Sequence, residues 1–224
     1  MAAHLDLEEQ EQLANFKHFW SQYGNLISWL VIAALAGYAG WNGWQYWQRK
    51  GGLEAAALYD ELDRAAQAGD SAKIERVWTD IQSQAGRTAQ GHQAALLAAK
   101  ALHQAGKVDA ARAALTWVIG KSSDEGLVAV ARLRLAGLEL DAKAPDAALK
   151  ALDAKVPPEF EGLLADRRGD VRLLQGQRDA ARDDYLKAYA ALPASSDYRP
   201  IVAAKLNAQG VDVQALVVKK ESSK

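Results

Sequence analysis

The sequence predicts an all-α protein: one N-terminal transmembrane helix, then an α-solenoid of about four helical hairpins plus a capping helix. Three observations support this fold class. Residues 19–48 contain no Asp, Glu, Lys or Arg. Turn signals then recur at intervals of 37, 37 and 33 residues, close to the roughly 34 residues of a helix–turn–helix repeat. Alanine is abundant while proline and β-branched residues are sparse, which favours helices.

The charge-free stretch has the length and flanks of a membrane span. The 22 residues from Leu26 to Trp47 would extend roughly 33 Å as a helix, close to a bilayer core of about 30 Å. Aromatic side chains suited to the headgroup level lie on both sides of it: Trp20, Tyr23, Trp41, Trp44 and Trp47. The sequence therefore predicts a single-pass anchor at residues 25–48 that contacts membrane lipid.

Two other interpretations of this stretch compete with a membrane span. A buried helix of a soluble core rarely runs this far without a charge. A cleaved signal peptide is favoured by Ala34-Leu35-Ala36, which resembles a cleavage site, but the residues before it are long and acidic rather than short and basic. We expect residues 1–24 to form an amphipathic segment at the membrane surface, with an extended polar tail as the alternative.

Small residues four apart in the span form a candidate strip for close packing against another helix. The pattern is weakly specific, because Gly and Ala are common in any transmembrane helix. The residues of this candidate helix-packing strip are Ala33, Ala36, Gly37, Gly40 and Gly43.

The composition of the chain argues against several classes of function. Residues 49–224 hold 26 basic and 24 acidic residues, so they lack the basic excess expected of a nucleic-acid-binding protein. The chain has no Cys, which excludes disulfides and thiolate catalysis. Its four His are not spaced as a metal set, and no phosphate loop or nucleophile motif is present. We expect no enzyme, metal or cofactor.

Residues 49–210 repeat a hairpin pattern. Turns are predicted at Gly69, Gly106, Lys143 and Gly176, and an Asp-Ala-Ala step follows the last three, where the Asp is suited to capping and the Ala to close packing. The predicted hairpins are 53–84, 88–120, 124–156 and 159–192, with a capping helix at 198–209. In the tail, 211–224, residues 213–218 are apolar and 221–224 are expected to be disordered.

These hairpins resemble tetratricopeptide repeats, most fully in the fourth unit with Gly169, Gly176, Ala181, Tyr185 and Pro193. The resemblance implies a groove lined by the first helix of each hairpin. Several of its leucines could instead pack between neighbouring helices, Leu173 most of all. The candidate groove residues are Tyr59, Gln93, Leu96, Lys100, His103, Leu133, Leu140, Leu163, Asp166, Asp170 and Leu174.

The whole chain resembles one bacterial family, the tetratricopeptide-domain ancillary subunit of the SecYEG translocon. The resemblance rests on Asn15-Phe16-Lys17, Tyr23-Gly24-Asn25, Trp44-Gln45-Tyr46-Trp47 and Ala57-Leu58-Tyr59, followed by the four repeats. It implies a single-pass inner-membrane protein with a cytoplasmic N-terminus and a periplasmic C-terminal domain. The implied partners are the SecYEG translocon, a membrane-anchored prolyl-isomerase-like periplasmic chaperone and exported polypeptides.

The expected function is therefore that of a non-enzymatic membrane-anchored adaptor or chaperone. Two alternatives stay open: a regulatory scaffold for one folded partner, and a structural membrane oligomer. Charges near the span weakly favour the opposite orientation, since Arg49 and Lys50 follow it and only Lys17 precedes it. One charge governs a long C-terminal domain poorly, so the orientation implied by the family is preferred.

Overall fold

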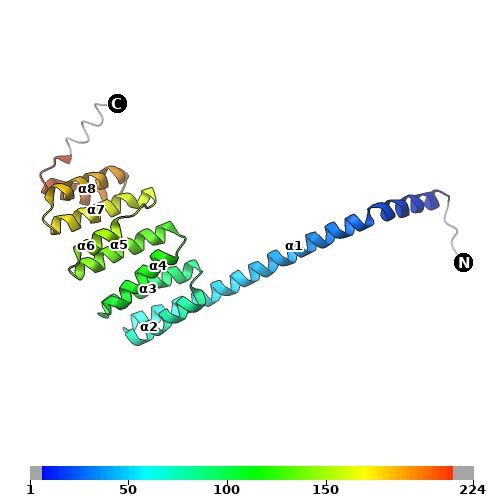
Figure 1. The fold of residues 1–224 in the computed structure, drawn as a ribbon, viewed down its shortest axis with the longest axis horizontal. Helices are drawn as coiled ribbons and strands as arrows, with labels where there is room; N and C mark the ends of the chain where they lie inside the picture. Colours follow the sequence, from blue (N-terminus) through cyan, green and yellow to red (C-terminus); the bar gives the residue numbers. More distant parts are fainter. Residues whose placement is uncertain (1–6, 214–224) are drawn as a thin grey trace, which may run out of the picture. The chain divides into compact units, whose positions relative to one another are not determined.

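The computed structural model describes residues 7–213, and those residues form helices joined by turns (Figure 1). The chain divides into two compact units, Met1–Gly51 and Gly52–Lys224. The apolar tail segment 213–218 lies outside the described residues except for Val213, and the expected disorder of 221–224 lies outside them entirely.

The first unit is the N-terminal part of α1, which spans Leu7–Gln67 without a break. Residues 7–23 are thus helical rather than extended. Within the described residues, 13–67 of α1 make one helix long and apolar enough to cross a membrane, by length and composition, and only 6% of its most apolar window is buried. The alternative of a buried core helix is therefore wrong, because side chains such as Leu30 and Leu35 are more than 60% exposed.

The second unit is a stack of antiparallel helix pairs, which confirms the predicted fold class (Figure 1). The end of α1 is followed by α2 and η1, and the later pairs are α3/α4, α5/α6 and α7/α8, with α9 at the end. Their bounds are α2 Ser71–Asp80, η1 Ile81–Ala85, α3 Ala89–Gln104, α4 Val108–Lys121, α5 Glu125–Asp141, α6 Pro145–Leu152, α7 Pro158–Leu174, α8 Arg178–Ala191 and α9 Arg199–Ala208.

The four predicted turn residues all have left-handed backbones, with φ of 68° at Gly69, 75° at Gly106, 60° at Lys143 and 77° at Gly176. After each of them, the next amide donates a hydrogen bond to the carbonyl five residues earlier, as in Lys107 to Leu102. This bond satisfies a carbonyl that the helix end leaves unpaired. Gly adopts this backbone freely, whereas Lys143 adopts it with strain.

The repeated alanines are the points of closest helix packing. Ala111, Ala148 and Ala181 have no exposed surface, and the larger apolar residue four positions later is also buried, for example Leu115 and Tyr185. Three apolar clusters run through the stack, the first from α1 to α5, the next from α5 to α7 and the last from α7 to α9. These clusters join successive hairpins, each of which could not bury its apolar face alone.

One sequence prediction about the second helices is wrong. Asp109, Asp146 and Asp179 do not cap them, because the residue before each helix is Lys107, Ala144 or Gln177 and forms no side-chain cap bond. Each Asp is instead the second residue of its helix. A carboxylate in the first turn still interacts favourably with the helix dipole.

Candidate partner-binding face

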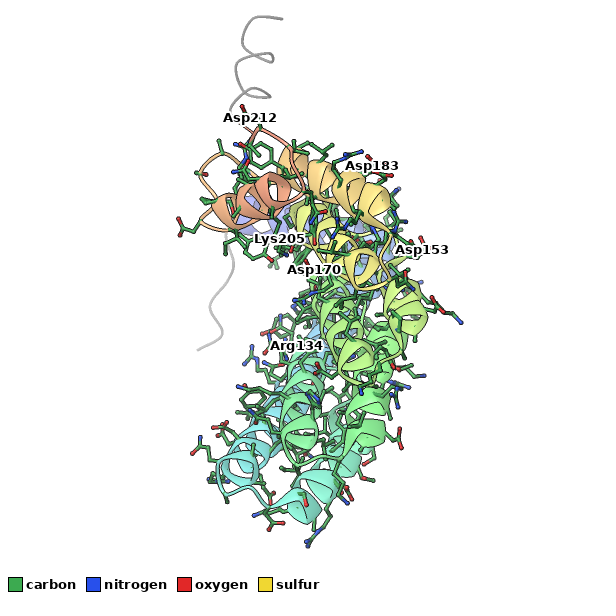
Figure 2. All side chains as sticks on the ribbon, turned by 90° about the vertical axis from the view of Figure 1, so that its left-hand side faces the viewer. Arg134, Asp153, Asp170, Asp183, Lys205 and Asp212 are labelled. Carbon is green, nitrogen blue, oxygen red and sulfur yellow. The ribbon has the colours of Figure 1, made fainter. Side chains whose placement is uncertain are left out.

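The first helices of the pairs present one common surface, here called the first-helix face: the solvent side of α1 from Gly52, α3, α5 and α7. Two contacts set α5 against α3. Arg134 Nη1 donates to the Leu96 carbonyl at 3.0 Å, and His103 Nε2 lies 3.5 Å from Asp141 Oδ2. Figure 2 shows Arg134, Asp170 and Lys205 on one side of the stack, and Asp153 and Asp183 on the other.

The structure leaves part of the predicted groove open to solvent. Gln93 and Lys100 are exposed on α3, and Leu174 at the end of α7 is 73% exposed. Tyr59 and His103 are half-buried, and His103 lies in the last turn of α3, where a basic residue favours the helix dipole. These side chains remain candidates for contact with a partner.

The predicted groove leucines are less accessible. Leu96 is 7% exposed, and it presents its backbone carbonyl to Arg134 rather than its side chain to solvent. Leu133 and Leu140 pack against the cluster between α5 and α7, while Leu163 and Leu173 pack against the last cluster. Packing between helices therefore accounts for a large part of this leucine pattern.

Asp166 and Asp170 are held inside the stack by α8 and α9. The Asp166 carboxylate is buried and accepts hydrogen bonds from Tyr198 Oη at 2.7 Å and from Lys205 Nζ at 2.7 and 2.8 Å. Asp170 accepts from Tyr185 Oη at 2.9 Å and from Lys205 Nζ at 2.7 Å. Asp166 therefore holds α9 against α7, and it exposes almost no surface to a ligand.

Burial has electrostatic consequences at this network. It raises the pKa of the Tyr185 hydroxyl, and the hydrogen bond to Asp170 raises it further. The pKa of Tyr198 is raised in the same way by burial and by Asp166. Both hydroxyls therefore stay protonated and donate to carboxylates.

A second buried carboxylate lies on α8. Asp184 is 1% exposed, and its oxygens lie 3.0 Å from Arg172 Nη1 and 3.6 Å from Arg168 Nε. Arg168 also donates to the Leu152 carbonyl at 3.2 Å, which links α7 to the end of α6. The carboxylates of Asp166 and Asp184 are thus buried, whereas the cations that pair with them stay partly exposed.

Arg134, which is exposed on α5 beside the predicted groove residue Leu133, was missed from sequence. Its hydrogen-bond acceptor, the Leu96 carbonyl, lies 38 residues earlier, so no local pattern indicated this contact.

A second surface feature lies on the other layer, where α4 meets η1. Trp117 lies in it, edge-on to Trp78 at 5.1 Å between ring centroids and 5.3 Å from the His92 ring. It is an open depression of about 600 Å³, lined by Gln82, Asp109, Arg112, Ala113, Thr116, Trp117, Gly120 and Lys121.

Arg112 at this depression is held by Glu139 of α5 through Nε–Oε1 and Nη2–Oε2 hydrogen bonds of 2.6 and 3.2 Å. This charge-assisted bond, together with Asp109, raises the pKa of the Arg112 guanidinium. The arginine therefore fastens α4 to α5. Among the described residues, no group of three or more His, Asp or Glu is placed to hold a metal ion.

A membrane-length helix followed by a stack of helical hairpins defines a helical-repeat protein. The tetratricopeptide repeat-like domain family matches residues 17–211, so the chain belongs to this family. Its relatives include proteins named "Ancillary SecYEG translocon subunit". The one from Neisseria gonorrhoeae is 34% identical over 92% of this chain and 99% of its own length.

Two further relatives of the same name are more distant. The protein from Haemophilus influenzae is 28% identical over 81% of this chain and 89% of its own length. The protein from Escherichia coli is 28% identical over 78% of this chain and 84% of its own length. The similarity therefore covers most of the chain in each case rather than the repeats alone.

Proposed function

We propose that this protein is a non-enzymatic, membrane-anchored ancillary subunit of the SecYEG translocon, which binds exported polypeptides and a membrane-anchored prolyl-isomerase-like periplasmic chaperone through its first-helix face. The observation that carries the proposal is the extent of the similarity. The Neisseria gonorrhoeae relative that bears this name aligns over 99% of its own length. The matched family region begins at residue 17, inside the apolar helix.

Tethering gives a weak binding surface a physical advantage. A binding site fixed to the membrane beside a channel exit meets emerging chains at an effective concentration set by the tether, on the order of millimolar for a short one. Micromolar or weaker intrinsic affinity then suffices for capture, and fast release allows hand-over. A partly polar face with few exposed leucines suits such transient contacts.

The proposed orientation places the N-terminus in the cytoplasm and the repeat domain in the periplasm of the inner membrane. Protease added to intact spheroplasts tests it. Digestion of residues 53–224 supports this orientation, and their protection until the membrane is lysed contradicts it.

Site-specific photo-crosslinking tests the binding role. A photoreactive residue at Gln93 or Leu133 on the first-helix face is expected to trap many newly exported chains. The same residue at Asp183, on the opposite layer, serves as the control. Adducts formed equally from both layers, or from neither, would count against the first-helix face.

A regulatory scaffold for one folded partner is the second candidate. The observation in its favour is that Leu133, Leu140 and Leu163 are partly used in the core, which leaves a less apolar face than an unfolded client would prefer. Crosslinking separates the two: one dominant adduct from Gln93 and Leu133 identifies the scaffold. Adducts only with a second copy of this chain identify the structural oligomer.

A further inference from the structure

The solvent side of α4 carries four residues spaced four apart, here called the α4 row: Asp109, Ala113, Trp117 and Lys121. Residues at this spacing follow one another along one face of a helix. All four line the open depression of about 600 Å³ where α4 meets η1. The α4 row belongs to the layer of second helices, so it is separate from the first-helix face.

The shape of this depression suits a protein element rather than a small molecule. A small-molecule site encloses most of its ligand, whereas Asp109, Ala113 and Lys121 are all exposed and the depression is open. The row covers about three turns of helix, which extend roughly 18 Å. A surface of this length is matched by another helix that lies against α4.

Trp117 is a rigid apolar anchor at the middle of the row. Its ring is edge-on to Trp78 at 5.1 Å and lies 5.3 Å from the His92 ring, while part of it stays exposed to solvent. A tryptophan that is already fixed loses little freedom on binding, and tryptophan is enriched at the centres of interfaces. The exposed Ala113 and Gly120 on the same face leave space for a partner beside the ring.

The two ends of the row carry opposite charges. Asp109 accepts a hydrogen bond from Arg112, which Glu139 also holds, and the Asp109 side chain is still 98% exposed. Lys121 is exposed in the last turn of α4 and makes no ion pair with another residue of 7–213. From the N-terminal to the C-terminal end, the row is therefore acidic, small, large and aromatic, then basic.

This order makes the row complementary to itself in the antiparallel direction. If a second α4 crosses the first with opposite polarity, Asp109 faces Lys121 of the other copy while Ala113 faces Trp117, because the two pairs share one midpoint in the sequence. Rows of residues four apart are the ridges that pack when helices cross at about 50°, the commonest class of helix packing. A two-fold interface between identical chains requires this kind of self-complementarity.

We propose that two copies of this chain associate through α4, with the α4 row of one copy crossing that of the other in the antiparallel direction. One helix crossing buries a small area, so the association is weak in solution. The membrane anchor proposed for α1 holds both copies in one membrane and raises their local concentration. The first-helix face stays free for other partners.

Disulfide formation in membranes that contain the full-length protein tests this contact, because the chain has no Cys of its own. In the proposed crossing, the two Ala113 positions lie about 6 Å apart along the helices and the two Gly120 positions about 15 Å apart. A disulfide joins Cα atoms no more than about 7 Å apart. Ala113→Cys is therefore expected to form dimers on mild oxidation about tenfold faster than Gly120→Cys, its control on the same exposed face.

Charge reversal in the Ala113→Cys protein tests the direction of the crossing. Asp109→Lys and Lys121→Asp each place like charges at both ends of the contact, and each is expected to slow disulfide formation by about tenfold. The double variant Asp109→Lys with Lys121→Asp exchanges the two signs and is expected to restore the rate. Because it contains both substitutions, this recovery also shows that neither one acts by unfolding the protein.

Three results would overturn the proposal. Equal rates for Ala113→Cys and Gly120→Cys would show random collision in the membrane. A double variant as slow as the single ones would exclude the pairing of Asp109 with Lys121. Absence of the disulfide, with the protein still in the membrane pellet, would exclude the contact through α4. None of these results would change crosslinking from the first-helix face, so failure of this inference is distinguishable from failure of the proposed function.

Discussion

His92 is a buried imidazole whose charge is suppressed by its surroundings. Its side chain lies against the Trp117 ring and is only 6% exposed, and its Nε2 has no hydrogen-bond partner in the described part of the chain. Burial lowers the pKa of His92, while a hydrogen bond to the Gly86 backbone and the negative charge of Asp124 act in the opposite direction. The folded protein therefore binds a proton here less readily than the unfolded chain.

This difference predicts an acid-dependent loss of stability. In the unfolded chain His92 protonates as the pH falls through its ordinary pKa of 6.5, so the unfolded state gains protons first and the free energy of unfolding decreases below that pH. Urea unfolding of the protein and of His92→Gln, measured between pH 7.5 and pH 5, checks this. The variant is expected to show a shallower pH dependence; equal slopes would contradict the assignment.

A second prediction at the scale of a single residue concerns the stability that Lys205 provides. Lys205→Met leaves the buried Asp166 carboxylate with Tyr198 alone, and breaking a buried ion pair costs roughly 3–5 kcal/mol. We expect the low end of that range, because the Lys205 side chain is 27% exposed. The measurement is thermal unfolding by circular dichroism.

The double variant Asp166→Asn with Lys205→Met provides the control for that effect. It removes the stranded charge, so it should unfold at a higher temperature than Lys205→Met alone. A double variant no more stable than the single one would show that Lys205 acts through packing.

At the scale of elements, the sequence predicted the turns and the buried sides of the helices, which depend on residues close together in the chain. The turns were predicted because Gly69, Gly106 and Gly176 recur at intervals close to a helical repeat or a multiple of it, and the same interval also identified Lys143, which no propensity would select. Alanine and the larger residue four positions later identified the buried side of each second helix. These signals depend on residues a few positions apart.

What the sequence could not predict depends on contacts between distant residues. Asp166 was taken as an open groove residue, because its partner Lys205 lies 39 residues later on α9. Asp109 was predicted to cap α4. The helix begins one residue earlier, at Val108, so Asp109 lies within its first turn. The contact between Arg134 and the Leu96 carbonyl likewise joins residues that lie 38 positions apart.

Two glycines in the first helices should respond oppositely to the same substitution. Gly137→Ala is expected to stabilise the protein by about 0.5–1 kcal/mol, because the methyl meets no atom and the helix gains propensity. Gly169→Ala is expected to destabilise it by about 1–3 kcal/mol, since its methyl would overlap the ring of buried Tyr185.

Urea unfolding of the full-length protein in detergent measures both changes. Shifts of the same sign would contradict the difference in space around the two glycines.

At the scale of the whole molecule, the proposed function depends on combining a membrane anchor with a binding surface. The apolar side chains of α1 that the structure describes before Gly51 are largely exposed, and a bilayer would cover them. The helical stack supplies a first-helix face of mixed polarity. The same surface released into solution would lose the local concentration on which weak binding depends.

Alkaline carbonate extraction of membranes that contain the full-length protein tests this account most directly. Because a spanning helix is embedded in hydrocarbon rather than held by surface charge, the protein should stay in the membrane pellet and dissolve only with detergent. Release into the carbonate supernatant, with the protein soluble in the absence of detergent, would contradict the account.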